Sequence, residues 1–315
     1  MPPFIFRRIA PAVLVLLVVG IGAFSLFQYV GDPVSNMVGQ DATPAQRERL
    51  HASCCRRSRW PSTSWRSLAD SDLPPAWLAD GRATYPLGTD DQGRDILSAL
   101  FYGARISLMV ALCSGALSVL VGVTAGLVAG FAGGVVDGLP MRLCDVMLSL
   151  PPILVALLID GVGRLVFPQA HDVLAFAVLV FAMSVSDWVR YARTVRGSTL
   201  VERDKEYVQA ARLIGVSRAR LLRRHVLPNV LGPVLVLATL QVGQAIVTEA
   251  TLSFLGVGVP PTHPSLGTLV RVGNDFLYAG EWWITVFTGA ALVLIAMSVN
   301  LLGDWLRDAL NPRLR

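Results

Sequence analysis

The sequence predicts an all-α protein of the membrane, a polytopic helical bundle with about six transmembrane helices. Hydrophobic residues make up 53% of the 315 positions, and the mean hydropathy of +0.56 is above the usual range for soluble domains. Charged residues make up only 16%, and they cluster between long apolar runs. A helix needs about 20 predominantly apolar residues to cross a bilayer, and these runs are close to that length or longer.

The first apolar run covers about residues 9–30 and follows Arg7 and Arg8. A cleaved signal peptide is the alternative interpretation, but the run is long for one and has no small-x-small cleavage site at its end. We therefore expect a retained helix in a first region, residues 1–30. The two arginines predict a cytoplasmic N-terminus, because basic residues favour the cytoplasmic side.

The other apolar runs cover about 106–130, 143–161, 173–189, 230–254 and 282–303. Six spans place both termini in the cytoplasm. The segment 190–228 carries ten basic and three acidic residues, which is typical of a cytoplasmic loop. The predicted extracytoplasmic loop 31–104 is rich in arginine, but long loops cross the membrane largely regardless of charge.

Two features predict how the spans pack and bend. Gly122, Gly126 and Gly130 recur every four residues along the second span, and small residues at this spacing let two helices approach closely. The pair Pro151-Pro152 interrupts the third span, because proline lacks the backbone donor that a continuous helix requires. A kink is the simplest reading of this interruption, and a gate hinge is the alternative.

Several activities are excluded or disfavoured by what the chain lacks. Lys205 is the one lysine, and it has no surrounding glycines of the kind that form a phosphate-binding P-loop. The chain is therefore not a P-loop ATPase. No Ser/His/Asp or paired-carboxylate arrangement stands out. The cysteines are not spaced as metal ligands; they are Cys54, Cys55, Cys113 and Cys144. We therefore expect a non-enzyme that binds neither cofactor nor metal.

The most informative segment runs from Glu206 to Gly215 and is followed, after nine residues, by His225-Val-Leu-Pro-Asn229. It is a short, arginine-rich stretch between two long apolar runs. It resembles the EAA motif, the cytoplasmic coupling loop of permease subunits in ATP-driven (ABC-type) importers. The positions that match the motif are Ala210, Ala211, Gly215, Leu227 and Pro228, while Gln209 stands where the family has Glu. Residues 224–229 resemble the dipeptide/oligopeptide/nickel branch.

The resemblance to the C-type peptide permease subunit covers about residues 85–315. Further matching segments are 85–95, 102–107, 249–256 and 304–315. Residues 1–30 look more like the sister B-type subunit, and residues 51–68 resemble neither. We interpret this as a fusion or frameshift that joined two permease genes; a divergent but genuine loop is the alternative. Residues 105–315 are then the permease domain, with a coupling loop at 190–228.

This resemblance implies a type I ABC importer permease fold in the bacterial inner membrane. The chain would form half of a pathway for di- or oligopeptides; nickel chelates or glutathione are the alternative substrates. Implied partners are a sister permease, two ATPase subunits that use ATP and Mg, and an extracytoplasmic binding protein. The alternatives are an impaired fusion product and a secondary transporter or channel that needs no ATPase.

The resemblance also implies roles within the coupling segment. We expect a helix at about 203–215, with Glu206 near its positive N-terminal end and Gly215 as its C-cap. Next to Gln209, the small Ala210 and Ala211 would let a groove on the ATPase approach the backbone, and Leu227-Pro228 would begin the fifth span. An amphipathic helix lying on the lipid surface is the alternative reading.

Four further residues are candidates outside the coupling loop. Glu249 is an ionisable residue in the fifth span, where such residues often serve function; it would line the path or contact the binding protein, or be an ordinary helix-end residue. Asp90, Asp91 and Arg94 would belong to a docking surface for the binding protein. The competing interpretation is a simple turn and helix cap formed by Thr89, Asp90 and Asp91.

Overall fold

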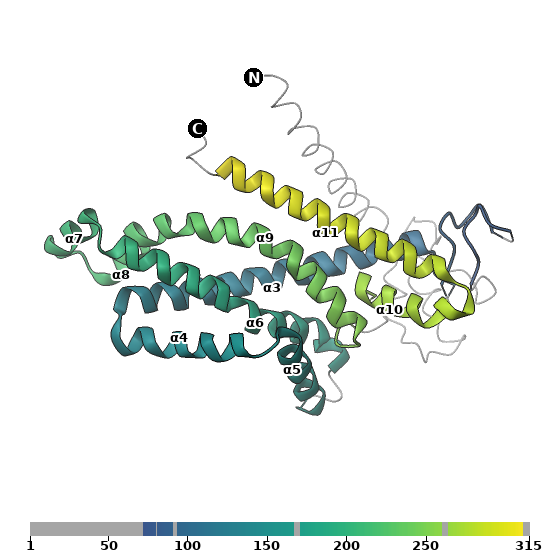
Figure 1. Ribbon diagram of the computed structural model, residues 1–315, viewed down its shortest axis with the longest axis horizontal. Helices are drawn as coiled ribbons and strands as arrows, with labels where there is room; N and C mark the ends of the chain where they lie inside the picture. Colours follow the sequence, from purple (N-terminus) through teal and green to yellow (C-terminus); the bar gives the residue numbers. More distant parts are fainter. Residues whose placement is uncertain (1–71, 80, 91–92, 167–170, 260–263, 311–315) are drawn as a thin grey trace, which may run out of the picture. The chain divides into compact units, whose positions relative to one another are not determined.

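A computed structural model describes residues 72–310, apart from 80, 91–92, 167–170 and 260–263 (Figure 1). The predicted first span 9–30 and the atypical segment 51–68 lie outside the described residues. Within them, every named element is a helix, and the one isolated β-bridge joins Thr89 to Asp95. The predicted all-α class is confirmed.

Four helices are long and apolar enough to cross a membrane. They include α3 (Ile96–Ala132), α6 (His171–Arg203), α9 (Leu227–Phe254) and α11 (Trp282–Leu310). These confirm the apolar runs predicted near 106–130, 173–189, 230–254 and 282–303. Each helix extends beyond its apolar run. In particular, α6 continues through residues 190–203, which the sequence had placed in the coupling loop.

The third predicted span, 143–161, is two helices rather than one. Helix α4 (Gly134–Ser149) and helix α5 (Pro152–Val166) meet at an angle of 96°. Leu150 is extended, with φ −100° and ψ 135°, because a residue that precedes proline avoids the helical region. Pro152 is the first residue of α5, where its missing N–H costs nothing. The predicted interruption of the third span is confirmed, as a sharp bend between two helices.

Two compact units make up the chain. Among the described residues, the first comprises 72–109 and 250–295, and the second comprises 110–249 and 296–310. In the described part of the first unit, helix α10 (Leu266–Phe276) begins at Ser265, whose hydroxyl accepts a hydrogen bond from the backbone N–H of Thr268. Ile96, Trp283 and Ile284 form a buried apolar cluster of the same unit.

In the second unit, the glycine ladder of α3 packs directly against α6. A Cβ atom at Gly126 would lie 2.9 Å from the Cβ of Val195, and one at Gly130 would lie 2.8 Å from the Cβ of Thr199. Real Cβ atoms do not approach this closely. The glycines therefore serve close helix packing, as their spacing predicted.

Candidate functional site: the coupling segment

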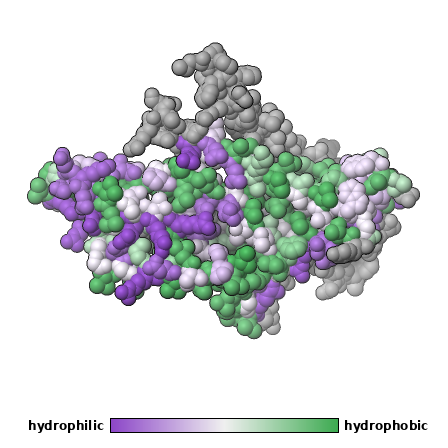
Figure 2. All heavy atoms as spheres, in the orientation of Figure 1, coloured by the Kyte–Doolittle hydropathy of each residue, from purple (hydrophilic) through white to green (hydrophobic). Residues whose placement is uncertain are grey.

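The segment between α6 and α9 forms a compact helical turn at one end of the second unit. After α6 ends at Arg203, the chain forms α7 (Glu206–Leu213), α8 (Arg218–Leu221) and a π-helical turn, η2 (Leu222–Val226), before α9 begins. Hydrophilic residues gather at this end, near α7 and α8 (Figures 1 and 2). The expected helix at 203–215 is thus present over a shorter range.

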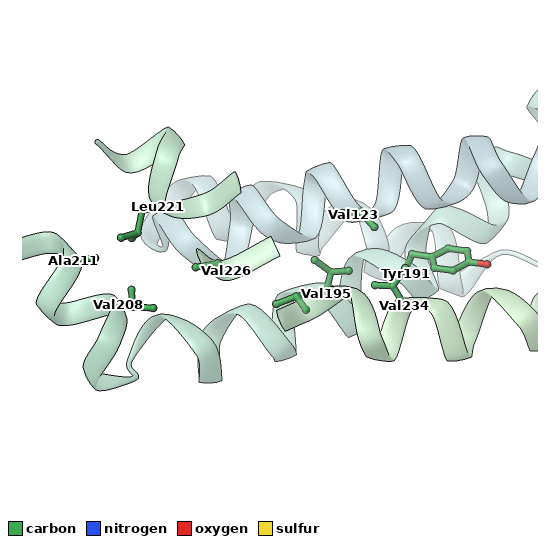
Figure 3. Packing of buried hydrophobic residues seen from close by; sticks show 9 residues of the cluster. Val123, Tyr191, Val195, Val208, Ala211, Leu221, Val226 and Val234 are labelled. Atoms are coloured by element: carbon green, nitrogen blue, oxygen red, sulfur yellow. The ribbon is translucent and has the colours of Figure 1, made fainter. Parts of the chain in front are cut away.

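One face of α7 is anchored in the apolar core of the second unit. Val208 and Ala211 are buried in a cluster that also contains residues of α3, α6, α8, η2 and α9 (Figure 3). The other members of the cluster are Val123, Tyr191, Val195, Leu221, Val226, Val230 and Val234. Arg212 adds a cation–π contact, with its guanidinium carbon 5.0 Å from the ring centroid of Phe131 near the end of α3. The inner face of α7 is therefore fixed to the membrane helices.

Gly215 ends α7 in the manner that its position predicted. Its φ of +84° is in the left-handed region, which favours glycine. The Gly215 N–H donates to the carbonyl of Arg212 at 3.0 Å, and the Val216 N–H donates to the carbonyl of Ala211 at 3.1 Å. This pair of bonds defines a Schellman motif, which satisfies carbonyls that the helix end would leave unpaired.

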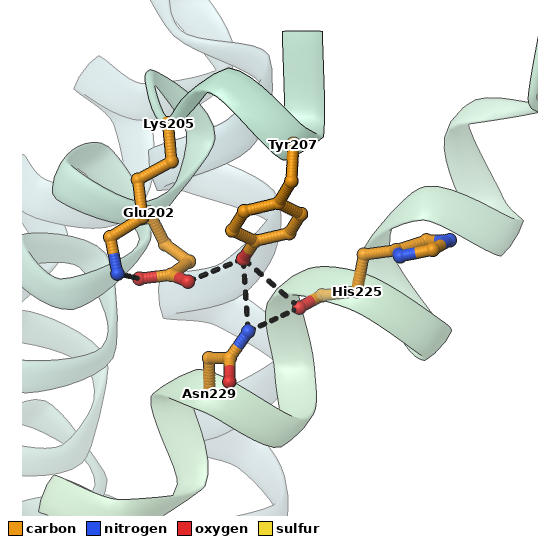
Figure 4. A network of polar contacts seen from close by, with 5 residues as sticks. All are labelled: Glu202, Lys205, Tyr207, His225 and Asn229. Carbon is orange, nitrogen blue, oxygen red and sulfur yellow. Dashed lines mark hydrogen bonds and ion pairs between the residues drawn. The ribbon is translucent and has the colours of Figure 1, made fainter. Parts of the chain in front are cut away.

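A polar network joins the start of α7 to α6 and α9 (Figure 4). The Tyr207 hydroxyl donates to the carboxylate of Glu202 in the last turn of α6, and Lys205 Nζ lies 2.6 Å from the other oxygen of that carboxylate. The Asn229 amide of α9 donates to the Tyr207 oxygen and to the His225 carbonyl, both at 2.9 Å. A single tyrosine thus connects three helical segments.

Gln209 and Glu206 stabilise the N-terminal turn. The Gln209 side-chain amide donates to the carbonyl of Asp204 at 3.0 Å, across the bend between α6 and α7. An ionised Glu at position 209, as the motif has, accepts hydrogen bonds only and could not form this bond. Glu206 lies in the first turn of α7, where the helix dipole favours a negative charge.

The π-helical turn before Pro228 follows from proline chemistry. Pro228 is the second residue of α9; it has no N–H, and its ring would clash with the carbonyl four residues earlier in a regular helix. Widening the turn over Leu222–Val226 avoids the clash. Leu227 packs against the buried cluster, so it anchors the beginning of α9.

The outer face of α7 carries two exposed apolar residues that sequence reasoning missed. Leu213 is 89% exposed and Ile214 is 82% exposed, and Ala210 is exposed one turn earlier. Residues three and four positions apart share one face of a helix. The spacing 210, 213 and 214 was therefore the signal that could have identified this apolar face.

The structure corrects the expectation for Ala211. We expected Ala210 and Ala211 to offer one small surface to a partner, but Ala211 is only 9% exposed and belongs to the core of its own chain. Ala211 faces this core, so it does not lie on the exposed face with Ala210. The available face consists of Ala210, Leu213 and Ile214.

Sequence similarity to a known protein family decides the family of this chain. Residues 122–315 match the family described as binding-protein-dependent transport system inner membrane component. The match includes the whole coupling segment. The chain belongs to this family.

Relatives of this permease carry names that refer to peptides. A putative peptide transport system permease of Brucella suis is 42% identical over 232 residues, which are 72% of this chain and 73% of the relative. The di/tripeptide transport system permease of Pseudomonas aeruginosa is 40% identical over 242 residues, 77% of each chain. The dipeptide transport system permease of Escherichia coli is also 40% identical over 242 residues, again 77% of each chain.

Solved structures support the permease fold. Inward-facing conformations of the MetNI methionine ABC transporter are similar, with a TM-score of 0.56 and 17% identity, over 69% of this chain and 98% of that chain. An amino acid ABC transporter has a TM-score of 0.52 and 15% identity, over 68% of this chain and 94% of that chain. The predicted ABC importer permease fold is confirmed.

Outside the coupling segment, the candidate docking residues do not form an exposed surface. Asp90 and Arg94 of the permease are 1% and 6% exposed, and Arg94 Nε lies 2.6 Å from Asp90 Oδ2. Asp95, rather than Thr89 or Asp90, caps α3 by accepting from the N–H groups of Leu97 and Ser98. The geometry favours a structural turn over a docking surface, and Asp91 lies outside the described residues.

Glu249 is fully buried in α9, five positions before the helix ends at Phe254. A side chain with no exposed surface cannot contact a binding protein in this conformation. Among the described residues, no group of three or more His, Cys, Asp or Glu side chains could hold a metal ion.

Proposed function

We propose that this permease forms half of the pathway for di- or oligopeptides in an ATP-driven importer. The names of the relatives at about 40% identity support this substrate class. The chain would bind no cofactor; ATP and Mg would be used by partner ATPase subunits. A sister permease, two ATPase subunits and an extracytoplasmic binding protein would complete the assembly.

The observation that carries the proposal is the two-sided character of α7. Its inner face is buried with α3, α6 and α9, while its outer face presents Leu213 and Ile214 to solvent. Large apolar side chains that protrude from a polar surface are typical of a docking site. A groove on one ATPase would enclose them, so that the movement of this ATPase on ATP binding would displace α7 and the three anchored helices together.

The same arrangement supports a cytoplasmic location for α7 and for both termini. Residues 190–228 carry ten basic residues, and such an excess favours the cytoplasmic side. An importer of this orientation would receive its peptide from a binding protein on the opposite side. It would release the peptide toward the ATPases.

Capture from detergent-solubilised membranes tests this function. The tagged chain is co-expressed with its genomic-neighbour sister permease and ATPases, beside the double variant Leu213→Ala/Ile214→Ala. We expect the parent to retain the ATPases and the variant to lose most of them, because about 1.5–3 kcal/mol is lost for each large apolar side chain that is no longer buried. The sister permease should stay bound to both.

Leu165→Ala is the matched control, because Leu165 is 83% exposed in α5, away from α7 in the sequence. It should capture the ATPases as well as the parent does. Equal capture by the parent and the double variant would refute α7 as the docking element. If the parent captures no ATPase at all, a transporter driven by an ion gradient becomes the better reading.

A further inference from the structure

The arginines of α6 differ in their partners. Arg193 pairs with Asp145 and Arg196 pairs with Asp137, and both aspartates lie on α4. Arg203 Nε lies 3.4 Å from Asp204 Oδ1. Among the described residues, Arg190 has no carboxylate within ion-pair distance. Its Nη1 instead donates to the neutral amide oxygen of Gln241 on α9, at 3.0 Å.

This pairing places a guanidinium at membrane depth. Gln241 lies in the middle of the predicted span 230–254, and Arg190 directly follows the predicted span 173–189. Asp187, one turn earlier on α6, is the carboxylate whose charge interacts with that of Arg190, and intramembrane ionisable residues mostly line an aqueous path or serve function. Arg190 is nevertheless exposed, so its guanidinium is accessible to a ligand.

Two further polar groups beside it lack partners among the described residues. They are the Gln241 Nε2 and the Ser186 hydroxyl, both buried. Because Gln241 Oε1 accepts from Arg190, the Nε2 end of that amide must remain a donor. Ser186 lies four residues before Arg190, on the same face of α6. The cluster therefore has unused capacity to donate hydrogen bonds, and Arg190 is its exposed member, which an acceptor-rich anion could reach.

We propose that Arg190, oriented by Gln241, binds the terminal carboxylate of the transported peptide as it passes through the membrane. Guanidinium groups bind carboxylates through two parallel hydrogen bonds, and every linear peptide carries a C-terminal carboxylate whatever its side chains. This proposal rests on the proposed peptide import, and it identifies one binding site along that transport path.

The test uses the complete complex, reconstituted in proteoliposomes with its binding protein. Uptake of radiolabelled dialanine and ATP hydrolysis are measured together. Arg190→Gln should lower the number of peptides transported per ATP by about tenfold, which is the loss expected for one charge-assisted hydrogen bond. The sister permease and the ATPase subunits should still co-purify with this variant. Arg190→Lys, which keeps the cation, should retain an intermediate ratio.

Gln241→Glu provides a second variant of the same shape. It places a carboxylate beside Arg190, which would compete with the peptide, so uptake per ATP should fall although the ion pair stabilises the fold. Arg142→Gln is the matched control, because Arg142 is an exposed arginine of α4 outside the proposed binding site; its ratio of uptake to ATP hydrolysis should equal that of the parent.

Three results would overturn the inference. Uptake per ATP could be unchanged in both Arg190→Gln and Gln241→Glu. Arg190→Gln could lose the sister permease, which would make the guanidinium an interface residue. Gln241→Glu could raise uptake, which would make Arg190 purely structural. A parent complex that assembles and hydrolyses ATP but carries no dialanine would instead contradict the proposed peptide substrate.

Discussion

Tyr207 holds the coupling segment together at the residue scale. Its hydroxyl contacts Glu202 of α6 and Asn229 of α9, so both membrane helices meet α7 at one atom. Tyr207→Phe removes that atom and retains the ring. We expect a loss of about 1 kcal/mol in the free energy of unfolding, measured as a lower melting temperature of the solubilised chain.

A double-mutant cycle with Glu202→Gln separates this hydrogen bond from other effects. If Tyr207 and Glu202 act through their mutual bond, the double variant loses less than the sum of the two single losses. Strict additivity would contradict the network.

The Tyr207 hydroxyl should also titrate late. Burial raises the pKa of Tyr207 above its ordinary value of 10, and the hydrogen bond to the Glu202 carboxylate raises it further. Because the folded-state pKa of Tyr207 is raised, the protonated hydroxyl stabilises the folded state fully below pH 10. This contribution to the free energy of unfolding is lost as the pH rises through the folded-state pKa. The difference in tyrosinate absorbance between the parent and Tyr207→Phe should therefore develop only above about pH 10. A difference that develops below pH 10 would contradict the geometry.

Ala210 and Ala211 show what the motif predicted and what it did not. Their spacing to Gly215 located α7 and its C-cap from the sequence alone. Which alanine faces outward depends on how α7 rotates against Val226, Val230 and the rest of the core, and no local pattern fixes that rotation. Leu213 and Ile214 were missed because apolar residues in a short helix are expected to point inward.

At the scale of elements, the contact between α3 and α6 depends on glycine. Gly126→Ala would place a Cβ 2.9 Å from that of Val195, and such overpacking costs about 1–3 kcal/mol. We expect a lower melting temperature and a lower yield of folded protein in detergent.

Gly115→Ala is the control on the same helix, because nothing lies within 4 Å of a Cβ at that position. It should be neutral or stabilise the helix by about 0.5–1 kcal/mol. Equal melting temperatures for the two alanine variants would refute the close-packing role of the ladder.

Two ion pairs attach α4 to α6. Arg196 Nη2 lies 2.6 Å from Asp137 Oδ2, and Arg193 pairs with Asp145. Asp137→Arg should destabilise the protein, because it places like charges together, and adding Arg196→Asp should restore much of the loss. The melting temperatures of the single and double variants test this exchange. A double variant no more stable than Asp137→Arg would exclude the pair as a structural link.

These pairs also explain why the sequence underestimated α6. The run of arginines at 190–203 was typical of a loop in water, and local polarity alone indicated that the membrane helix had ended. The helix continues because aspartates on α4, about fifty residues earlier, neutralise its arginines. In contrast, the break between α4 and α5 was predictable, since proline acts on its own backbone.

At the scale of the whole molecule, hydrophobic runs were sufficient to predict an all-α membrane protein, and the order of four matched segments was sufficient to predict the family. The burial of Asp90 and Arg94 could not be predicted, because it depends on how residues 72–95 fold back on themselves. The hypothesis that residues 51–68 mark a fusion stays a prediction. Resequencing the locus tests it, and two intact permease genes at that site would contradict it.

Photo-cross-linking from position 213 tests most directly whether α7 docks against an ATPase. Benzoyl-phenylalanine replaces Leu213 in the assembled complex, and Leu165, which is 83% exposed in α5, is the control position. We expect an adduct with an ATPase subunit from position 213 and none from position 165. An intact complex that gives no ATPase adduct at 213, or equal adducts at 213 and 165, would contradict the proposal that α7 transmits ATPase movement to this permease.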